Sequence, residues 1–528
     1  MKFRYDKEKE ELVVSESTRI EYHQIKLWLT RHVKGYKFTP QYKMGVWNGQ
    51  QSYFRDGKIN LGLWKELLKA CKEIEVPFIM ENKEDFPINR AVTLDEVREF
   101  CLDFFKNHKI KKDNKWIPFM PYDHQIETAY KILKNRYCMA EVATSGGKSL
   151  IISLVLFYTM KFIDPKAKFL IIVPSISLVT QFYDDLLQNF YGENFLVENK
   201  DKDIVSVNGI LRIEEVMSEK PRKWSGKLDA NIYIGTYQSL EKWPKEFFKQ
   251  FHTVITDEAH SAKNKTITTI LGHTFGVAYS RFGVSGTFPI DTSCEILSVQ
   301  SVLGPKITEV TAKELINKGI ITQMSIKSII MNHNNPELDA RMYQIRKAGY
   351  GKEALEIEKE YAHQSEKRID FIKKIISKCE DNTLLLFHTI EYGEKLFTVL
   401  SEAFPDKNFH YIDGSISGKK REEIKKKMEQ SAGIQILIAS FGCLSTGVSI
   451  KNLHNVIFAD SFKSEQIIIQ SIGRALRLHS TKKVATIYDL VDVFKNENYN
   501  NILYTHYRER LTFYKKREYP YKEYKINL

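Results

Sequence analysis

The chain has 528 residues, of which 43% are apolar and 27% are charged. This composition excludes a collagen-like or wholly disordered chain, and the length predicts roughly three to four globular domains. Lysine and arginine outnumber aspartate and glutamate by 79 to 66, a net charge of +13 that favours a polyanionic partner such as nucleic acid.

The N-terminal segment MKFRYDKEKEELVV has no apolar core behind its basic start, so it predicts no secretory signal. The longest apolar run, Leu150 to Met160, is too short to span a bilayer. The six cysteines form no C-x-x-C pair and predict reduced thiols rather than a disulfide framework or a zinc site. We therefore expect a cytoplasmic protein.

Residues 1–90 differ in composition from the rest of the chain. Between Arg31 and Lys58, six lysines and arginines stand against one acid, and six aromatic residues, Trp47 among them, lie between the charges. Basic and aromatic side chains together suit phosphate contact and base stacking. This predicts a nucleic-acid-binding domain with Trp47 as a candidate contact. The alternative is a small α+β domain whose aromatic residues form its core.

From about residue 119 onward, short β-rich runs alternate with helical stretches. The apolar runs predict strands at 136–142, 169–174, 231–236, 253–258 and 281–286. Near-continuous apolar runs are typical of parallel strands that are buried on both faces. Because helical stretches lie between most of them, this part of the chain is predicted to be a doubly wound α/β unit.

A glycine-bearing segment, Ala143 to Ser149 (ATSGGKS), follows the first of these strands and precedes a helix. Backbone N–H groups at a helix N-terminus point at phosphate oxygens, and the helix dipole adds positive potential. In such a loop Lys148 reaches the β- and γ-phosphates of a nucleotide and the Ser149 hydroxyl coordinates Mg²⁺. The strict G-x-x-x-x-G-K-[ST] pattern is not met, because Val142 occupies the first glycine position.

An acidic pair, Asp257 and Glu258, ends the strand predicted at 253–258. An aspartate at a strand end is where a nucleotide's Mg²⁺ is held, and a neighbouring glutamate can orient and deprotonate the attacking water. Adjacent acids at a strand end also occur as solvated turn residues. The phosphate loop upstream favours the catalytic interpretation.

A second series of apolar runs predicts strands at 383–389, 409–414, 434–440, 455–460 and 484–490. Two α/β sheets in tandem are therefore expected. The charged stretch 335–370 predicts a connecting helix between the sheets, and residues 501–528 predict a basic, helical C-terminal tail.

The motifs between about residues 119 and 490 resemble, in order, those of superfamily 2 helicases. The DEAH run ending at His260 matches the family in full, whereas Ser145 stands in place of a glycine in the family's A-T-G-x-G-K-T segment. The resemblance implies an ATP site made of Gln125, Thr144, Ser145, Gly146, Gly147, Lys148 and Ser149. It implies strand contacts at Pro174, Ser175, Thr236 and Gln238, and coupling of hydrolysis to movement through His260, Ser285 and Thr287.

In the second series, residues 470–477 (QSIGRALR) match the family's Q-x-x-G-R-x-x-R. The resemblance implies that Arg474 and Arg477 are arginine fingers, since an always-charged planar guanidinium suits the charge that develops on a transferring phosphoryl group. The resemblance also implies that Gln470 takes part in coupling hydrolysis to movement. His388 and Thr446 are implied strand contacts, although Ser449 stands where aspartate or asparagine is common.

The resemblance implies an α/β fold of two tandem RecA-like P-loop lobes, with parallel sheets flanked by helices, a small α+β N-terminal domain and a helical C-terminal tail. The expected domains are a nucleic-acid-binding domain at 1–90, a first lobe with linker at 91–320, a second lobe at 321–500 and the tail at 501–528. Hydrolysis is assigned to Lys148, Asp257, Glu258, Arg474 and Arg477, with ATP and Mg²⁺ as cofactors.

A closer similarity, over essentially the whole chain, is to the helicases of T-even bacteriophages, as in residues 35–49 and 441–459. It implies a monomeric ATP-dependent helicase of the host cytoplasm that acts on branched DNA: Holliday junctions, forks, D-loops and R-loops. Its roles would be recombination, repair and replication control, beside single-strand-binding or recombination proteins and with RNA–DNA hybrids as further substrates.

Three alternatives stay open. An RNA helicase carries the same DEAH box, and the translocating subunit of a restriction system has the same motor, although no nuclease-like cluster of acids and lysine stands out. A non-catalytic strand-annealing protein could share the fold, but it would be expected to lack one of the catalytic residues, and all of them are present.

Overall fold

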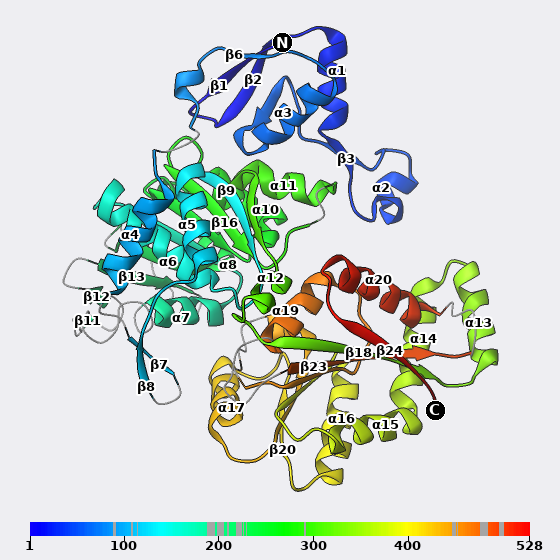
Figure 1. Cartoon of the computed structure of the whole chain (residues 1–528). Coiled ribbons are helices and arrows are strands. Elements are labelled where there is room, and N and C mark those ends of the chain that lie inside the picture. The colour runs from blue at the N-terminus through cyan, green and yellow to red at the C-terminus, as the bar shows by residue number, and fades with distance from the viewer. Residues whose placement is uncertain are drawn as a thin grey trace. The chain divides into compact units, whose positions relative to one another are not determined.

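The computed structural model describes the chain except for residues 88–90, 107–108, 113–114, 187–195, 198–204, 208–210, 218–223, 225, 229, 290–291, 446–449, 451, 476–483 and 496–500. The described residues form two compact units, 1–142 with 147–310, and 143–146 with 311–528. Figure 1 labels many of the elements of each unit. No helix of the described part is long and apolar enough to cross a bilayer. All six cysteines are described, and each is buried and free of a disulfide.

The N-terminal region of the first unit is α+β, as expected. Its four-stranded sheet has the order β5-β2-β1-β6, in which β1 and β2 are antiparallel. The strands are β1 Lys2–Asp6, β2 Glu11–Glu16, β5 Lys58–Asn60 and β6 Ile79–Met80, and a separate two-stranded ribbon pairs β3 Thr30–His32 with β4 Gln50–Ser52. The helices are α1 Arg19–Trp28, α2 Pro40–Lys43 and α3 Trp64–Glu73, with the 3-10 turns η1 Tyr36–Phe38 and η2 Leu61–Leu63.

The main sheet of the first unit has nine strands in the order β11-β12-β13-β14-β10-β15-β16-β9-β17. It is parallel from β13 to β17, and β11 and β12 extend it in antiparallel pairing. The strands are β9 Tyr137–Val142, β10 Phe169–Val173, β11 Leu196–Val197, β12 Val205–Val207, β13 Leu211–Val216, β14 Ile232–Thr236, β15 Thr253–Asp257, β16 Ser280–Ser285 and β17 Lys306–Val310. All five strands predicted in this part are confirmed, and every residue of β9, β10, β14, β15 and β16 is buried, as the apolar runs require.

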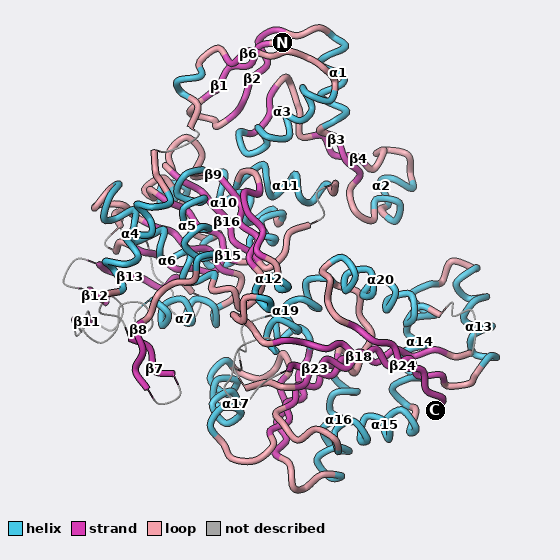
Figure 2. Tube along the Cα trace, in the orientation of Figure 1, coloured by secondary structure: helices cyan, strands magenta, loops and turns pink. Residues whose placement is uncertain are grey.

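Helices flank these strands (Figures 1 and 2). They are α4 Leu94–Phe105, α5 Asp123–Asn135, α6 Lys148–Tyr158, α7 Ile176–Asp184, α8 Tyr237–Leu240, α9 Lys245–Phe248, α10 Lys265–Gly272 and α11 Cys294–Leu303, with the 3-10 helix η7 Ala259–Lys263. A β7 Lys109–Lys112 and β8 Lys115–Pro118 hairpin lies between α4 and α5 in the sequence.

The N-terminal region shares one hydrophobic core with the main sheet of the first unit. Phe3 and Phe54 belong to the same buried cluster as Met139 and Leu303. A buried ion pair adds to this contact, because Arg281 at the start of β16 donates two hydrogen bonds to the Glu10 carboxylate. The core and the ion pair together attach residues 1–87 firmly to the first main sheet.

The second unit has a seven-stranded, fully parallel sheet in the order β20-β21-β19-β22-β23-β18-β24. The strands are β18 Gln323–Asn332, β19 Thr383–Phe387, β20 Asn408–Ile412, β21 Gln435–Ser440, β22 Asn455–Phe458, β23 Val484–Val493 and β24 Tyr521–Asn527. The helices are α12 Ala312–Asn317, α13 Pro336–Lys347, α14 Gly351–Gln364, α15 Glu366–Ser377, α16 Ile390–Ala403, α17 Gly418–Gln430, α18 Phe441–Ser445, α19 Glu465–Ala475 and α20 Ile502–Lys516. The five strands predicted here are confirmed, so the fold is two RecA-like lobes in tandem.

Two expectations about the second unit need correction. The stretch 335–370 is not one connecting helix but α13, α14 and the start of α15, all within the second unit. Gly349, with φ of +93°, ends the first of them, and Ser365 caps the third by accepting the Arg368 N–H. The tail is helical only in α20, because β24 pairs with β18 over seven residues and completes the sheet.

Candidate active site

The phosphate loop lies between β9 and α6. β9 ends at Val142 and α6 begins at Lys148, and the turn between them contains Thr144, Ser145, Gly146 and Gly147. Gly147 has φ of +83°, and a Cβ atom there would lie 2.1 Å from the Gln125 amide nitrogen, so this position requires glycine. Ser145 also has a positive φ, +69°, which explains why glycine is favoured where this chain has serine.

Gln125, predicted to read adenine, lies in the first turn of α5 and is buried. Its side-chain oxygen accepts the Tyr122 backbone N–H at 2.9 Å. Its amide nitrogen faces Gly147 of the phosphate loop. The structure therefore brings Gln125 and the loop together, as the resemblance implies.

Three adjacent parallel strands bring the predicted catalytic segments together. β15 pairs with β16 in a register that sets Asp257 opposite Val284, and β16 pairs with β9 so that Ser285 is opposite Glu141. Because these strands run in the same direction, the DEAH segment, the 285–287 segment and the phosphate loop all leave the sheet at its carboxyl edge. In open α/β sheets this edge is where ligands bind.

The side chains around Glu258 form a connected polar cluster. Lys148 Nζ lies 3.8 Å from Glu258 Oε1. The Ser285 hydroxyl donates to Glu258 Oε2 at 3.3 Å, and it lies 2.8 Å from His260 Nδ1. The backbone N–H of Thr287 donates to the same hydroxyl at 3.3 Å. The cluster thus joins the lysine of the loop, the DEAH acid and the 285–287 segment through direct contacts.

Burial and neighbouring charges shift the pKa values of the two acids, Asp257 and Glu258, in opposite directions. Burial raises the pKa of Asp257, and the negative charge of Glu258 raises it further, to about 7. Burial also acts to raise the pKa of Glu258, but the positive charge of Lys148 and a hydrogen bond with His260 outweigh it and hold that pKa below its usual value. Glu258 is therefore the acid that stays ionised, a state that suits it to accept a proton from water.

Asp257 has an unsatisfied oxygen. Its Oδ1 atom is buried and forms no hydrogen bond in the described structure, and neither does the hydroxyl of the preceding Thr256. Buried polar atoms without partners are costly in proteins unless a ligand supplies the partner. Oxygen atoms are the ligands that Mg²⁺ prefers, and Ser149 provides a further hydroxyl in the first turn of α6. These residues fit a magnesium–nucleotide, whereas no cluster of three or more His, Cys, Asp or Glu side chains among the described residues could hold a metal by itself.

The predicted strand contacts of the first unit also meet at the carboxyl edge. β10 pairs with β14 in a register that sets Val173 opposite Thr236. Pro174 and Ser175 follow β10, and Ser175 precedes the first residue of α7. Thr236 is buried and caps α8 by accepting the Ser239 N–H at 3.3 Å, which leaves Gln238 exposed beside it.

The predicted site residues of the second unit are only partly described. His388 is exposed just after β19, and its backbone N–H donates to Asp460 Oδ2 at 3.0 Å. Gln470 lies on α19, where its side-chain oxygen is buried and forms no hydrogen bond in the described structure. Arg474 lies on the same helix, with its side chain outside the described part. Arg477 and Thr446 lie outside the described residues.

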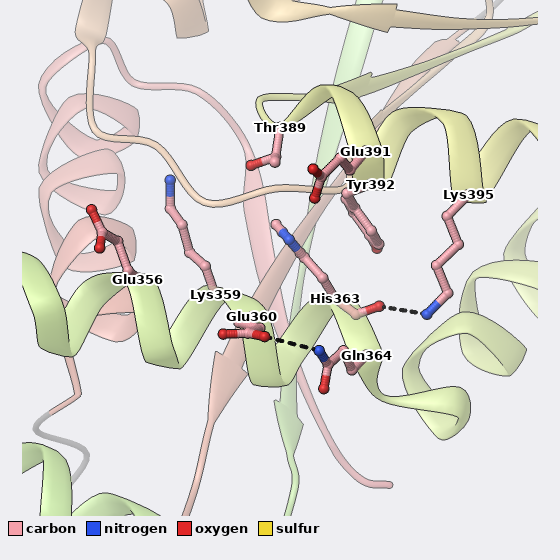
Figure 3. A pocket seen from close by; sticks show the side chains of 9 residues that line it. All are labelled: Glu356, Lys359, Glu360, His363, Gln364, Thr389, Glu391, Tyr392 and Lys395. Carbon is pink, nitrogen blue, oxygen red and sulfur yellow. Dashed lines mark hydrogen bonds between the residues drawn. The ribbon is translucent and has the colours of Figure 1, made fainter.

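A cavity of about 390 Å³, with Thr389 in its lining, opens between α14 and α16 (Figure 3). The His363 ring stacks on Tyr392 with centroids 3.9 Å apart, and it pairs with the buried Asp460 carboxylate at 3.3 Å. The cavity is lined by Glu356, Lys359, Glu360, His363, Gln364, Thr389, Glu391, Tyr392 and Lys395. Cations and acids alternate around it, so its charge selects no ligand class.

Trp47 is less available than the sequence suggests, because it is half-buried and its indole N–H donates to the Gln50 carbonyl at 2.9 Å. Three apolar neighbours are instead exposed: Phe38 by 81%, Val46 by 75% and Met44 by 68%. Phe38 is one of the six aromatic residues that mark this segment in the sequence, whereas Met44 and Val46 belong to no such pattern. Three exposed lysines, at positions 34, 37 and 43, lie in the same segment.

The DEAD/DEAH box helicase family matches residues 122–296, and the helicase conserved C-terminal domain matches residues 367–479. The chain is 29% identical over 478 residues to the ATP-dependent DNA helicase UvsW of Enterobacteria phage T4, which covers 89% of this chain and 87% of that protein. The crystal structure of T4 UvsW aligns at 24% identity over 100% of this chain and 99% of that one, with a TM-score of 0.47. The type ISP restriction-modification enzyme LlaBIII bound to DNA aligns at 16% identity over 79% of this chain and 32% of that one, with a TM-score of 0.56, and shares the fold.

Proposed function

The chain belongs to the superfamily 2 helicases, and from this premise we propose that it is an ATP-dependent DNA helicase that remodels branched DNA. The observation that carries the proposal is the contact of Lys148 with Glu258 beside the unsatisfied oxygen of Asp257. A lysine and two acids in this arrangement suit phosphoryl transfer to water. The relative from phage T4 is named as a DNA helicase, which favours DNA over RNA.

We assign the following roles in hydrolysis. Lys148 and the loop N–H groups would hold the phosphates of ATP, and Ser149 and Asp257 would hold Mg²⁺, which would supply positive charge to offset that of the phosphate oxygens. Glu258 accepts a proton from the attacking water as the oxygen of that water bonds to the γ-phosphorus and the bond to the β–γ bridging oxygen breaks, releasing ADP. Arg474 and Arg477 would balance the charge that develops during this transfer.

The N-terminal region is the proposed source of preference for branched DNA. A motor that grips one strand does not distinguish a fork from a single-stranded tail. Phe38 and Val46 present exposed apolar surface among exposed lysines, which suits stacking on a terminal base pair with the phosphates held nearby. Deleting residues 1–90 would not test this role, because the deletion would leave Arg281 buried without Glu10. Point substitutions of the exposed residues are needed.

The test is the ATPase rate of the full chain with single-stranded DNA, duplex DNA, a four-way junction, an R-loop and RNA in parallel. We expect the four-way junction to give the highest rate, and Phe38→Ala to lower the junction-stimulated rate while leaving the single-strand rate unchanged. Phe54→Leu is not a suitable control, because Phe54 is fully buried. Tyr343→Ala is suitable, because it removes an aromatic ring that is 48% exposed in the second unit. RNA as the strongest activator would favour an RNA helicase instead.

A further inference from the structure

Helix α11 is buried along almost its whole length, and it contacts two different regions within the first unit. Eight of its ten residues are buried. One side meets the N-terminal region, and another meets η7, the segment that follows Glu258. A helix held in this way cannot shift against one neighbour without disturbing the other, because close-packed interiors do not deform gradually.

On the N-terminal side, the main polar contact is the Tyr53 hydroxyl. It donates to the carbonyl of Cys294 at 2.9 Å and shares a hydrogen bond with the Ser298 hydroxyl. Gly62 of η2 adds a steric contact, since a Cβ atom there would lie 2.0 Å from the Gln300 carbonyl oxygen. The N-terminal region therefore touches the backbone of α11 directly at two places.

On the catalytic side, α11 is joined to η7 by charge and by packing. Lys263 Nζ on η7 lies 3.1 Å from Glu295 Oε1 on α11. Gly283 of β16 lies where η7 and α11 meet: a Cβ atom there would come within 2.5 Å of Ala259 and 2.6 Å of Leu303. Ala259 directly follows Glu258 in the chain, so the position of α11 bears on the position of the catalytic acid.

We propose that α11 couples the N-terminal region to the hydrolysis site, and that Tyr53 is the positioning residue at its N-terminal contact. When the exposed segment around Phe38 binds a DNA junction, the resulting shift of that segment moves β4 and Tyr53, and Tyr53 in turn moves α11. The shift of α11 then alters the position of η7 and of Glu258. This inference rests on the proposed function. Contiguous contacts alone do not establish coupling, so it needs a test in which binding and rate are separated.

The test compares Tyr53→Phe with Tyr22→Phe in the full chain. Both substitutions remove one hydroxyl, but the Tyr22 hydroxyl accepts the Gly57 N–H inside the N-terminal region and does not reach α11. For Tyr53→Phe we expect the junction-stimulated kcat to fall about threefold to tenfold, the factor carried by one neutral hydrogen bond. The junction Kd and the single-strand-stimulated rate should stay at wild-type values, and Tyr22→Phe should behave as wild type.

Two further measurements keep the outcome decisive. Ser298→Ala removes one of the two hydrogen bonds of the Tyr53 hydroxyl and leaves the bond to the Cys294 carbonyl, so its effect should be no larger than that of Tyr53→Phe, and the double variant should be no slower than Tyr53→Phe alone. Hydrogen exchange of the DNA-free protein should be faster in residues 257–263 and 294–303 of Tyr53→Phe. Unchanged junction kcat together with unchanged exchange in 257–263 would overturn the coupling role. A wild-type protein that junction DNA does not stimulate would refute the proposed function instead, and the exchange result would then decide the role of Tyr53.

Discussion

Two buried aspartates, Asp492 of the second unit and Asp257 of the first, are held differently. In the second unit, Asp492 accepts hydrogen bonds from Arg368 at 2.8 and 3.1 Å and pairs with His333 at 2.9 Å. Burial acts to raise the pKa of Asp492, but Arg368 and His333 together hold it well below its usual range. In the first unit, Asp257 is equally buried, has an oxygen without a partner, and has a raised pKa.

This difference separates a structural acid from a functional one. A buried carboxylate whose partners are all supplied by the protein stabilises one arrangement of the chain. A buried carboxylate that lacks partners is costly in the free protein and gains them only when a ligand binds. The contrast therefore favours a ligand contact for Asp257 and a structural role for Asp492, and substitutions of these two residues should have different effects.

The largest effect is expected at Lys148. Lys148→Ala should reduce ATP hydrolysis at saturating DNA to background, because no other described side chain contacts Glu258 with a fixed positive charge. The melting temperature should remain close to that of the wild type. Lys161→Ala is the matched control, since Lys161 pairs with Asp103 at the surface, and such pairs add little to stability. Wild-type turnover by a folded Lys148→Ala protein would contradict the site.

The arginines of the second unit should act on rate rather than on affinity. Loss of an arginine finger lowers the hydrolysis rate by about 10³-fold or more in related phosphoryl-transfer enzymes, and two arginines that share the work would each cost less. Arg474→Ala and Arg477→Ala should therefore bind ATP with near wild-type affinity and hydrolyse it slowly. Single-turnover rates and ATP titrations of each variant would show this. A large loss of affinity with an unchanged saturating rate would make them binding residues.

The same substitution at the two aspartates should have opposite effects on stability. Asp492→Asn leaves the buried Arg368 without its ionised partner and should lower the free energy of unfolding by about 3–5 kcal/mol. Asp257→Asn removes a buried acid whose Oδ1 atom has no hydrogen-bond partner, and it should leave that free energy unchanged or higher, while hydrolysis is lost. Urea unfolding curves of both variants provide the measurement. Equal destabilisation by both would remove the distinction between scaffold and site.

A smaller effect should appear on acidification, at His506 of the second unit. Burial, and after it the positive charge of Arg510, lower the pKa of His506 from 6.5 to about 4. As the pH falls, the unfolded chain binds this proton first, so this contribution to stability is complete above about pH 6.5 and is lost as the pH falls from 6.5 to 4. Between pH 7 and pH 5 the wild type should lose about 2 kcal/mol more than His506→Gln in urea unfolding. If the free energy of unfolding of the two proteins changed by the same amount between pH 7 and pH 5, the pH dependence would come from groups other than His506.

Five strands of each sheet could be predicted because parallel strands that are buried on both faces need near-continuous apolar runs, whereas β11, β12, β13, β17 and β18 were not predicted. β24 escaped prediction because its sequence, YKEYKIN, is polar and mostly exposed at the edge of the sheet. The break between α13 and α14 was signalled by Gly349 and Gly351, which a reading of charge alone overlooks.

The candidate site was predictable in its members but not in its contacts. Lys148, Asp257 and Glu258 stand in recognisable motifs, whereas the link from Glu258 through Ser285 to His260 depends on the register of β15 with β16, which the sequence does not encode locally. The contact of Tyr53 with α11 joins residues about 240 positions apart and carries no motif. Such contacts follow from tertiary packing alone.

The most direct test of the central claim is conversion of a labelled four-way DNA junction into its duplex products by the wild type and by Glu258→Gln, each with ATP. The wild type should convert the junction, and Glu258→Gln should bind it with similar affinity but leave it intact, because only the proton acceptor for the attacking water has been removed. Conversion by Glu258→Gln at the wild-type rate would contradict this account. So would a wild-type protein that leaves the DNA junction intact but unwinds an RNA duplex.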